Sequence, residues 1–466
     1  MDKKKLLYEL ASIVLGLIVA FLPPPAGLTV QSMWTLGIML WAIMNWMFRP
    51  VPEYVAAILM CSMWVVLKIV PFADAFGALG SSTVWLVIGV LGIGTAVTNS
   101  GLLKRITLMI MKLFPSNFKG QVMAILGAGT LTAPLIPSTT AKVSIAGPIV
   151  AGIGVTLGLG KRSTGMSGLM VAMYTGFCLT GPVFLSASFF AYVVLGVLPA
   201  EVQAHFTWMN WFLAALPWSI VMLAGSYFAI ILLFSPKDAK TIPKEVIREQ
   251  IKALGPLSKN EKITLIVLAG CIVLWILEAR MGIPAVIPSV VGLCLLTAFG
   301  VLSIADFNTK IPWNIIAFVA GILGLAKVLS AVGVNAWIGA TCGPYMSTLS
   351  ANPYLFVAVT AVAIFIARFI VVDQVTPLTL FTVILAPFCV IGGMNPWIGG
   401  FIVYIMNMMW VVQFQNPQYV IAMTAAGGEE NIHYRETTKF CFAYLLITVM
   451  GLLICVPYWK MIGLIQ

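Results

Sequence analysis

The sequence has little charge and almost no histidine. Only 9% of its 466 residues are Asp, Glu, Lys or Arg, whereas an ordinary soluble domain has roughly 25%. The two histidines, His205 and His433, both fall in expected loops, which excludes a His-rich metal site and disfavours a hydrolase. The eight cysteines are scattered singly without a CxxC pair, and we interpret them as small packing residues.

Apolar residues make up most of the chain. They make up 61% of the chain, and the mean hydropathy is +1.04. Uncharged stretches such as 163–200 and 374–428 exceed the roughly 20 residues that one membrane span needs. The first apolar segment follows "MDKKK" without a small-residue cleavage site, and we interpret it as a retained helix. The chain is therefore predicted to be an all-α polytopic membrane protein.

The net charge of +11 is informative through its placement. With a cytoplasmic N-terminus, most of the 26 Lys and Arg residues fall on cytoplasmic loops, as the positive-inside rule expects. We therefore interpret the basic charge as a topology signal and expect no nucleic-acid partner. Three basic residues remain inside expected membrane segments: Lys142, Lys327 and Arg368.

We expect about 11 transmembrane helices and two re-entrant hairpins. The helices are expected at 6–22, 29–47, 53–71, 83–103, 164–197, 207–234, 263–279, 283–302, 312–338, 396–425 and 438–464. An N-terminal helix (1–28) precedes a first repeat (29–234), a cytoplasmic linker (235–262) and a second repeat (263–466). In the linker, Pro243 begins a stretch with Ile247, Ile251 and Leu254 on one stripe, which indicates an interfacial helix.

The hairpins are expected at 120–160 and 353–392. Each segment is too long for one helix and is interrupted near its middle, by "LIPSTTA" and "DQVTPLT". Lys119 and Lys161 flank the first segment, which places both its ends in the cytoplasm, whereas the second lacks such flanking charges. Irregular backbone at membrane depth persists only where it is buried in protein or lines a water-filled cavity.

The two halves resemble each other. "GVLGIGTAVTNSGLL" (89–103) aligns without gaps with "GILGLAKVLSAVGVN" (321–335), and each precedes a hairpin. With an odd number of crossings between them, the repeats are inverted, as is typical of secondary transporters. Such repeats bring the two hairpin tips together near the middle of the membrane.

The tips and two further helix breaks are the candidate binding residues. Proline frees a helical carbonyl, and free carbonyls, hydroxyls and helix N-termini are groups that bind an anion or a small cation. The tips supply Ser138, Thr139, Thr140 and Lys142 in the first hairpin and Thr376 and Thr379 in the second. The breaks supply Thr180, Gly181 and Pro182 in the first half and Gln415, Asn416 and Pro417 in the second.

The intramembrane charges have competing interpretations. Lys142 is either a fixed cation beside an anionic substrate or a lysine whose amine reaches the cytoplasmic interface. Arg368 and Asp373 form an ion pair within the second hairpin, or Asp373 accepts a proton or a cation. The sequence assigns no role to Lys327.

The first hairpin, "PSTTAKVSIAGPI", resembles the divalent anion:sodium symporter (DASS) family of the ion transporter superfamily, whose members transport di- and tricarboxylates or sulfate. That family has Ser-Asn-Thr at each tip, then an apolar run and Pro-Ile. Ser138, Thr139 and Thr140 occupy the motif here, followed by Pro148 and Ile149. The C-terminal "YWKMIGLI" is also similar to the family's last span.

Two departures from the family bear on coupling. Thr139 replaces the Asn that helps to bind sodium, and the second motif becomes Pro377, Leu378 and Thr379. Family exchangers resemble "SNTAR", and Lys142 stands at the place of their basic residue. The resemblance thus implies anion exchange with Lys142 in place of sodium. It further implies a homodimer whose transport domain moves as an elevator.

The predicted function is secondary transport of organic dianions such as malate, succinate, 2-oxoglutarate, citrate or tartrate by exchange. A sodium- or proton-coupled symporter of dicarboxylate, sulfate or sulfonate is the alternative, with Asp373 as the proton candidate and Na+ as the coupling ion. A membrane-embedded enzyme or a channel is the more remote possibility. We expect no cofactor and no metal, and a place in the bilayer of a bacterial inner membrane.

Overall fold

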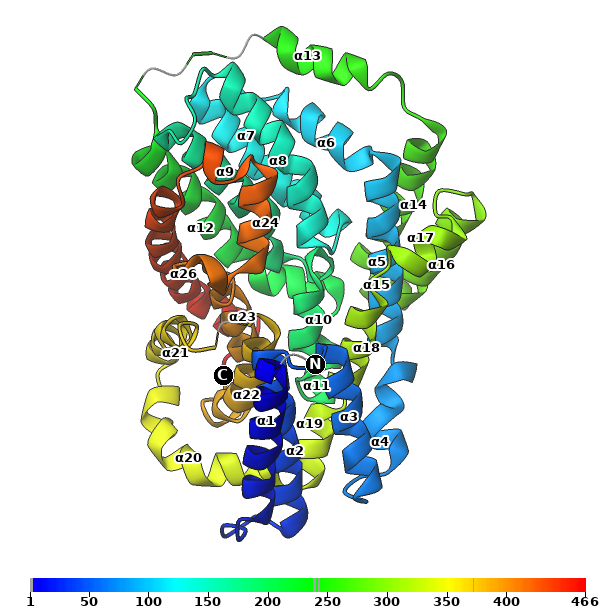
Figure 1. Ribbon diagram of the computed structural model, residues 1–466, viewed down its shortest axis with the longest axis vertical. Coiled ribbons are helices and arrows are strands. Elements are labelled where there is room, and N and C mark those ends of the chain that lie inside the picture. Colours follow the sequence, from blue (N-terminus) through cyan, green and yellow to red (C-terminus); the bar gives the residue numbers. More distant parts are fainter. Residues whose placement is uncertain (1–2, 238–239, 242–243, 372) are drawn as a thin grey trace.

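The computed structural model describes residues 3–237, 240–241, 244–371 and 373–466 (Figure 1). Within these ranges the chain forms helices and a single isolated β-bridge, between Met394 and Ile465. Among the described residues, 6 helices are long and apolar enough to cross a membrane, and shorter apolar helices accompany them. The all-α prediction is confirmed, whereas the number of spans stays a prediction.

The first half contains most of the irregular helix. Its α-helices are α1 (Lys3–Phe21), α2 (Val30–Phe48), α3 (Glu53–Val66), α4 (Phe72–Phe76), α5 (Ser82–Ser100), α6 (Leu102–Met111), α7 (Phe118–Thr132), α8 (Thr139–Thr156), α9 (Thr164–Tyr174), α10 (Phe189–Gly196), α11 (Ala200–His205) and α12 (Trp208–Phe234). Short 3₁₀ or π turns are η1 (Gly77–Gly80), η2 (Ala133–Leu135), η3 (Thr175–Leu179), η4 (Gly181–Val183) and η5 (Leu185–Ala187).

The second half follows the linker helix α13 (Lys244–Ala253). Its elements are α14 (Lys259–Ile276), α15 (Glu278–Met281), α16 (Val286–Ala298), α17 (Ile304–Thr309), α18 (Trp313–Ile322), α19 (Leu325–Ala331), α20 (Val334–Ser350), α21 (Pro353–Ala367), α22 (Val375–Ile391), α23 (Pro396–Met406), η6 (Gln413–Gln415), α24 (Pro417–Ala425), α25 (Gly428–Asn431) and α26 (Tyr434–Met461).

The expected hairpins are pairs of helices around a non-helical tip. In the first, α7 and α8 are separated by residues 133–138, where Pro134 and Pro137 interrupt the helical hydrogen bonds. In the second, α21 and α22 are separated by residues 368–374. Figure 1 shows α7 and α8 in the upper half of the molecule and α21 and α22 in the lower half, so the pairs enter from opposite ends.

The broken helices link the two halves. Helix α9 packs against both α7 and α8, and the matching helix α23 packs against both α21 and α22. After its break, each helix contacts the hairpin of the other half: α10 packs on α22, and α24 packs on α8. This exchange of partners gives both hairpin tips the same kind of surroundings.

One expected helix, 312–338, is interrupted twice. Helix α18 ends at Ile322, and Gly324 lies so close to α4 that an added Cβ would stand 3.0 Å from the Asp74 carbonyl oxygen. Gly333, with φ of +77°, then ends α19 in a left-handed turn that favours glycine. Helix α20 starts a new direction and runs along the lower edge of Figure 1.

The linker (235–262) packs against the helices of the first half. Ile247 of α13 is buried and α13 contacts α6, so the expected interfacial helix packs its apolar stripe on protein; Pro243, its expected start, lies outside the described residues. Arg105 of α6 pairs with Glu261 of α14 at 2.6 Å and donates to the Gly255 carbonyl at 3.0 Å. Both charged side chains are more than nine-tenths buried.

Replacing Arg105 with alanine should lower the free energy of unfolding by about 3–5 kcal/mol, because Glu261 is left as a buried charge without its partner. Thermal unfolding of the purified protein, followed by size-exclusion chromatography, measures the change. The double variant Arg105→Met with Glu261→Met should recover part of the loss. Exposed Lys104 is the matched control, and equal effects of Lys104→Ala and Arg105→Ala would contradict the prediction.

Candidate functional site

A cavity of about 270 Å³ opens beside the tip of the first hairpin. This volume lies near the lower end of the usual range of ligand pockets, roughly 300–1,000 Å³. Six successive residues of the tip, 136–141, line it, and so do polar residues of α5. The expected tip residues Ser138, Thr139 and Thr140 therefore share one cavity.

The N-terminus of α8 supplies the donors on the tip side. The Ser138 hydroxyl accepts a hydrogen bond from the N–H of Ala141 and so caps the helix. The first N–H groups of a helix have no partner within it, and Thr139 and Thr140, which carry two of these groups in α8, line the cavity. Such a helix start favours an anion such as a carboxylate.

Polar residues of three other elements also line the cavity, and sequence reasoning missed them. Thr95, Thr98 and Asn99 come from α5, and Lys310 at the end of α17 donates to the Asn99 side chain at 2.9 Å. Gln418, the second residue of α24, is buried and lies one position beyond the expected Pro417. Thr95, Thr98 and Asn99 stand at positions i, i+3 and i+4, a spacing in the sequence that could have indicated one polar face of α5. The hydroxyls of Thr95 and Thr98 bond back to their own helix.

Lys142 lies behind this cavity in the first turn of α8. Its side chain is 1% exposed, and its ammonium group donates to the Ala187 carbonyl at 3.0 Å. An amine that reaches the cytoplasmic interface would be exposed, so that interpretation of Lys142 is wrong. Within the described residues, Lys142 has no carboxylate partner.

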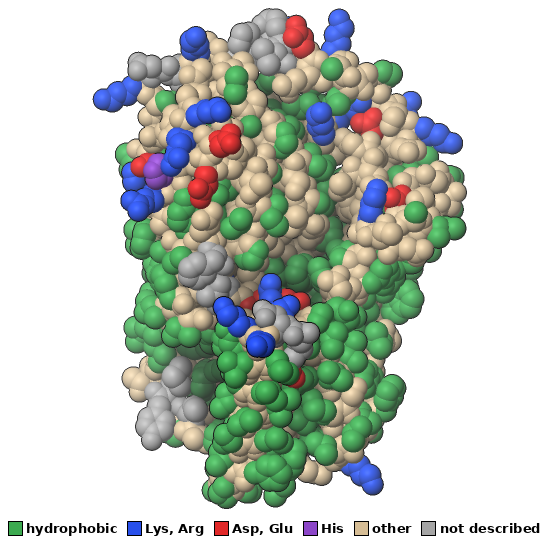
Figure 2. All heavy atoms as spheres, viewed as in Figure 1, with side chains coloured by type: hydrophobic (Ala, Val, Ile, Leu, Met, Phe, Trp, Pro, Cys, Tyr) green, Lys and Arg blue, Asp and Glu red, His purple; other side chains and the backbone are tan. Residues whose placement is uncertain are grey.

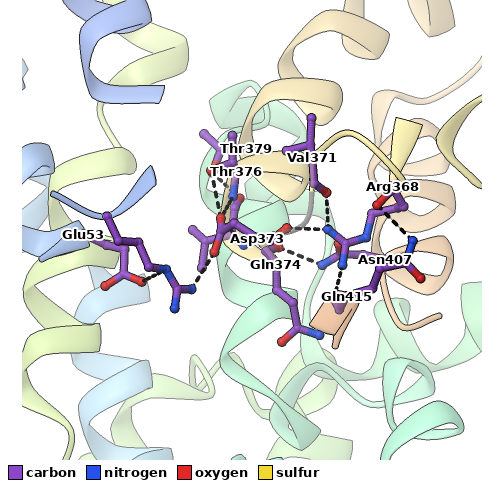
Figure 3. A network of polar contacts seen from close by, with 11 residues as sticks. Glu53, Arg368, Val371, Asp373, Gln374, Thr376, Thr379, Asn407 and Gln415 are labelled. Atoms are coloured by element: carbon purple, nitrogen blue, oxygen red, sulfur yellow. Dashed lines mark hydrogen bonds and ion pairs between the residues drawn. The ribbon is translucent and has the colours of Figure 1, made fainter. Parts of the chain in front are cut away.

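Asp373 caps the second hairpin at the start of α22 (Figure 3). Its carboxylate accepts hydrogen bonds from the N–H of Val375 and from both the N–H and hydroxyl of Thr376, at 2.7–3.0 Å. It also pairs at 2.7 Å with Arg49, at the end of α2. The expected ion pair between Arg368 and Asp373 is therefore not formed, because the carboxylate turns toward the helix start and toward Arg49.

Arg368 is fully buried at the end of α21 (Figure 3). Its guanidinium donates to three backbone carbonyls, those of Val371, Asp373 and Gln415. Like Lys142, it has no ion-pair partner among the described residues. A buried guanidinium normally pairs with a carboxylate, whereas here three carbonyl dipoles stabilise its positive charge and the Asp373 carboxylate, although close in the chain, bonds elsewhere.

Lys142 and Arg368 make similar contacts from opposite sides of their tips, because Lys142 follows the first tip in α8 and Arg368 precedes the second at the end of α21. Each belongs to a hairpin, and each donates to a carbonyl in the broken helix of its own half. Ala187 and Gln415, the two acceptors, both stand two residues before the helix resumes, as α10 or as α24. Among the described residues, the structure thus places one buried basic side chain without an ion pair beside each tip.

The expected break residues have protein partners. In the first half, the Thr180 hydroxyl bonds to Thr130 at 2.9 Å, and the Pro182 carbonyl accepts from Trp211; Gly181 begins η4. In the second, Asn416 caps α24, where Pro417 is the first residue, and Gln415 binds the main chain at Arg368. By position, Ser188 at the start of α10 matches Asn416, and sequence reasoning missed it.

The second tip begins earlier than the motif count predicts. Helix α22 starts at Val375, so Thr379 lies one turn inside it and bonds back to the Val375 carbonyl. Thr376 lies at the helix start and bonds to Asp373. Neither threonine lines the cavity at the first tip.

Three buried polar atoms around the second tip lack a partner, namely Arg368 Nε, Gln374 Nε2 and Asn407 Oδ1, and Gln418 Oε1 lacks one at the cavity of the first tip. Unpaired polar atoms are uncommon in buried places and indicate room for water or a polar ligand. Among the described residues, no group of three or more His, Cys, Asp or Glu side chains is arranged to hold a metal. The polar lining therefore offers hydrogen bonds and positive charge.

Comparison with known proteins finds related transporters. Dicarboxylate transporter 1, chloroplastic, of Arabidopsis thaliana is 25% identical over 98% of this chain and 83% of its own length. The L-tartrate/succinate antiporter of Shigella flexneri is 26% identical over 81% of each chain. The putative malate transporter YflS of Bacillus subtilis is 26% identical over 72% of this chain and 71% of its own.

Two solved structures share the fold. Neisseria gonorrhoeae MtrF aligns with a TM-score of 0.57 at 12% identity, over 98% of this chain and 94% of its own. Alcanivorax borkumensis YdaH aligns with a TM-score of 0.52 at 12% identity, over 87% and 89%. The family model described as the sodium:sulfate symporter transmembrane region matches residues 3–465. The chain belongs to this family of integral membrane transporters.

Proposed function

We propose that this protein exchanges organic dianions, such as malate, succinate, 2-oxoglutarate or tartrate, across a membrane. The observation that supports this most is the pair of buried cations, Lys142 and Arg368, without carboxylate partners. Their two positive charges match the two negative charges of a dicarboxylate. The names of the relatives point to the same substrates.

The two fixed charges also favour exchange over sodium coupling. Burying an unpaired charge in a low-dielectric region is costly, and the cost falls when an opposite charge joins it. The empty carrier would move two cations without an ion pair, whereas the loaded carrier is balanced. Asp373, the proton candidate of the symport alternative, already binds Arg49 and the start of α22, which disfavours a coupling role.

We extend the proposal to the geometry of transport. The hairpins and broken helices (α7–α10 and α21–α24) form a transport part that slides along a scaffold part (α1–α5, α14, α16 and α18), within a homodimer. The halves are inverted repeats. The packing of α10 on the second hairpin and of α24 on the first supports this inference. The membrane is a bacterial inner membrane.

Orientation follows from charge. Lys and Arg side chains gather mostly over the upper part of Figure 2, around α6, α7 and α13, whereas hydrophobic side chains cover the lower part. The positive-inside rule then favours the upper end as the cytoplasmic one, and the basic residues Lys3, Lys4 and Lys5 favour the same side for the N-terminus, which Figure 1 marks near mid-height. The cavity at the first tip, with Lys310 at its edge, would face the cytoplasm.

Uptake into proteoliposomes tests the proposal. Labelled succinate should enter vesicles preloaded with unlabelled dicarboxylate, and neither an inward sodium gradient nor an inward proton gradient should replace the internal anion. Vesicles without protein are the control, and sulfate is tested as a competitor. Sodium-driven uptake into vesicles without internal anion would instead establish the symport alternative.

A further inference from the structure

A second cavity, of about 750 Å³, lies at the opposite end of the helix pair α10 and α18. The first cavity includes Phe189, where α10 begins, and the second includes Leu198, just past its end. Because α10 has 8 residues, about 12 Å of packed helix separates the two. Gly196 lies against Leu323 in this barrier, close enough that an added Cβ would clash.

The internal repeat relates the two cavities. Leu91, Gly94, Thr95, Thr98 and Asn99 of α5 line the first cavity, and the residues aligned with them line the second: Leu323, Ala326, Lys327, Ser330 and Ala331. The same face of the repeated helix therefore borders both cavities. If the halves are inverted, the cavities open to opposite sides of the membrane.

Each cavity has one lysine paired with an equivalent aspartate. Lys310 pairs with Asp306 at 2.7 Å, and Lys327 pairs with Asp74 at 2.5 Å. In the repeat alignment Asp74 corresponds to Asp306, whereas the two lysines stand at different positions. Hydrogen bonds from Lys310 and Ser303 hold the pKa of Asp306 well below its ordinary value, so that carboxylate stays ionised at neutral pH.

Lys327 is accessible to an incoming anion. Its side chain is 67% exposed although it stands in an apolar helix, and Ser330 lies beside it in the cavity. Exposed ion pairs contribute only about 0–1 kcal/mol, so another carboxylate can replace Asp74 at small cost. A cation in a cleft with low-dielectric walls also raises the local concentration of anions.

We propose that the second cavity is an anion-receiving vestibule in which Lys327 leaves Asp74 and binds one carboxylate of the transported dianion. In the first cavity, Lys310 likewise leaves Asp306 and binds one carboxylate of the transported dianion. This inference rests on the proposed exchange of dianions and adds a second binding site, on the other face of the barrier.

Side-specific kinetics test the vestibule. The KM for labelled succinate is measured from each side, in right-side-out and in inside-out membrane vesicles preloaded with succinate. Lys327→Gln should raise the KM roughly three- to tenfold from the side of the second cavity only, with kcat unchanged. Asp74→Asn frees the lysine and should lower the KM from that same side. Lys310→Gln should give the mirror-image pattern.

The outcomes separate the two proposals. Lys327→Gln with both KM values unchanged, or raised equally from both sides, would overturn the vestibule while leaving exchange intact. Absence of exchange by the unaltered protein would overturn the proposed function and the vestibule with it. Because Lys327 is exposed, its variant should fold, which thermal unfolding verifies.

Discussion

Lys142→Met should abolish dianion exchange, with a loss of at least about 100-fold, while the protein stays folded. Methionine keeps most of the side-chain volume and removes the charge, so the effect reports on charge alone. A 100-fold loss of the exchange rate corresponds to about 2.7 kcal/mol. The interaction of a buried positive charge with a dianion is large enough to account for this loss. Exchange in preloaded proteoliposomes measures it.

The same substitution, Lys142→Met, should not lower the stability of the protein. Lys142 is 1% exposed and has one carbonyl partner, and replacing poorly compensated buried charge by an apolar group is often neutral or stabilising. The melting temperature of Lys142→Met should therefore be unchanged or higher. Lys112→Met, at an exposed position, is the matched control and should alter neither quantity. Normal exchange by Lys142→Met would refute the charge role.

Arg368→Met should remove exchange and also destabilise the protein, by about 3–5 kcal/mol. Three buried carbonyls lose their donor, and an unsatisfied buried acceptor costs about 1–3 kcal/mol, with effects that do not simply add. Arg368 therefore has two roles. It supplies positive charge, and its hydrogen bonds connect the tip of the second hairpin to the break before α24. Lys142 is expected to have only the first role. Thermal unfolding and preloaded exchange, measured on the same preparation, distinguish these roles.

Arg368→Lys is the informative partner variant. Lysine keeps the positive charge but lacks the planar fork that reaches several acceptors at once. It should restore part of the exchange and little of the stability. If Arg368→Met melts like the unaltered protein, the fastening role is wrong, and if it exchanges normally, the charge role is wrong.

The elements that come from local signals could be predicted from the sequence. The hairpin tip at Pro137, the cap at Ser138 and the helix start at Pro417 each follow from proline or hydroxyl chemistry within a few residues. The alignment of 89–103 with 321–335 likewise predicted that the two halves are repeats, although not that both aligned segments would border cavities. Fold class and substrate class followed from composition and from the resemblance.

The partners of charged side chains could not be predicted. Arg49 is far from Asp373 in the chain, so nothing near either residue indicates their ion pair. The interruption at Gly324 has a similar cause, because the backbone of α4 comes close only in the folded protein. Gln418 looked like an interior helix residue, and its place at the cavity depends on α24 packing against the opposite hairpin.

The glycine contacts between the two parts have a consequence for motion. At Gly94 an added Cβ would stand 2.5 Å from the ring of Pro137, and Gly196 meets Leu323 in the same way. Where packed helices interdigitate, sideways displacement must lift side chains out of their holes. At these two contacts glycine forms one side, so the proposed sliding motion would have to displace fewer interdigitated side chains there. We expect polar links such as the pair of Arg49 and Asp373 to set the barrier to translation instead.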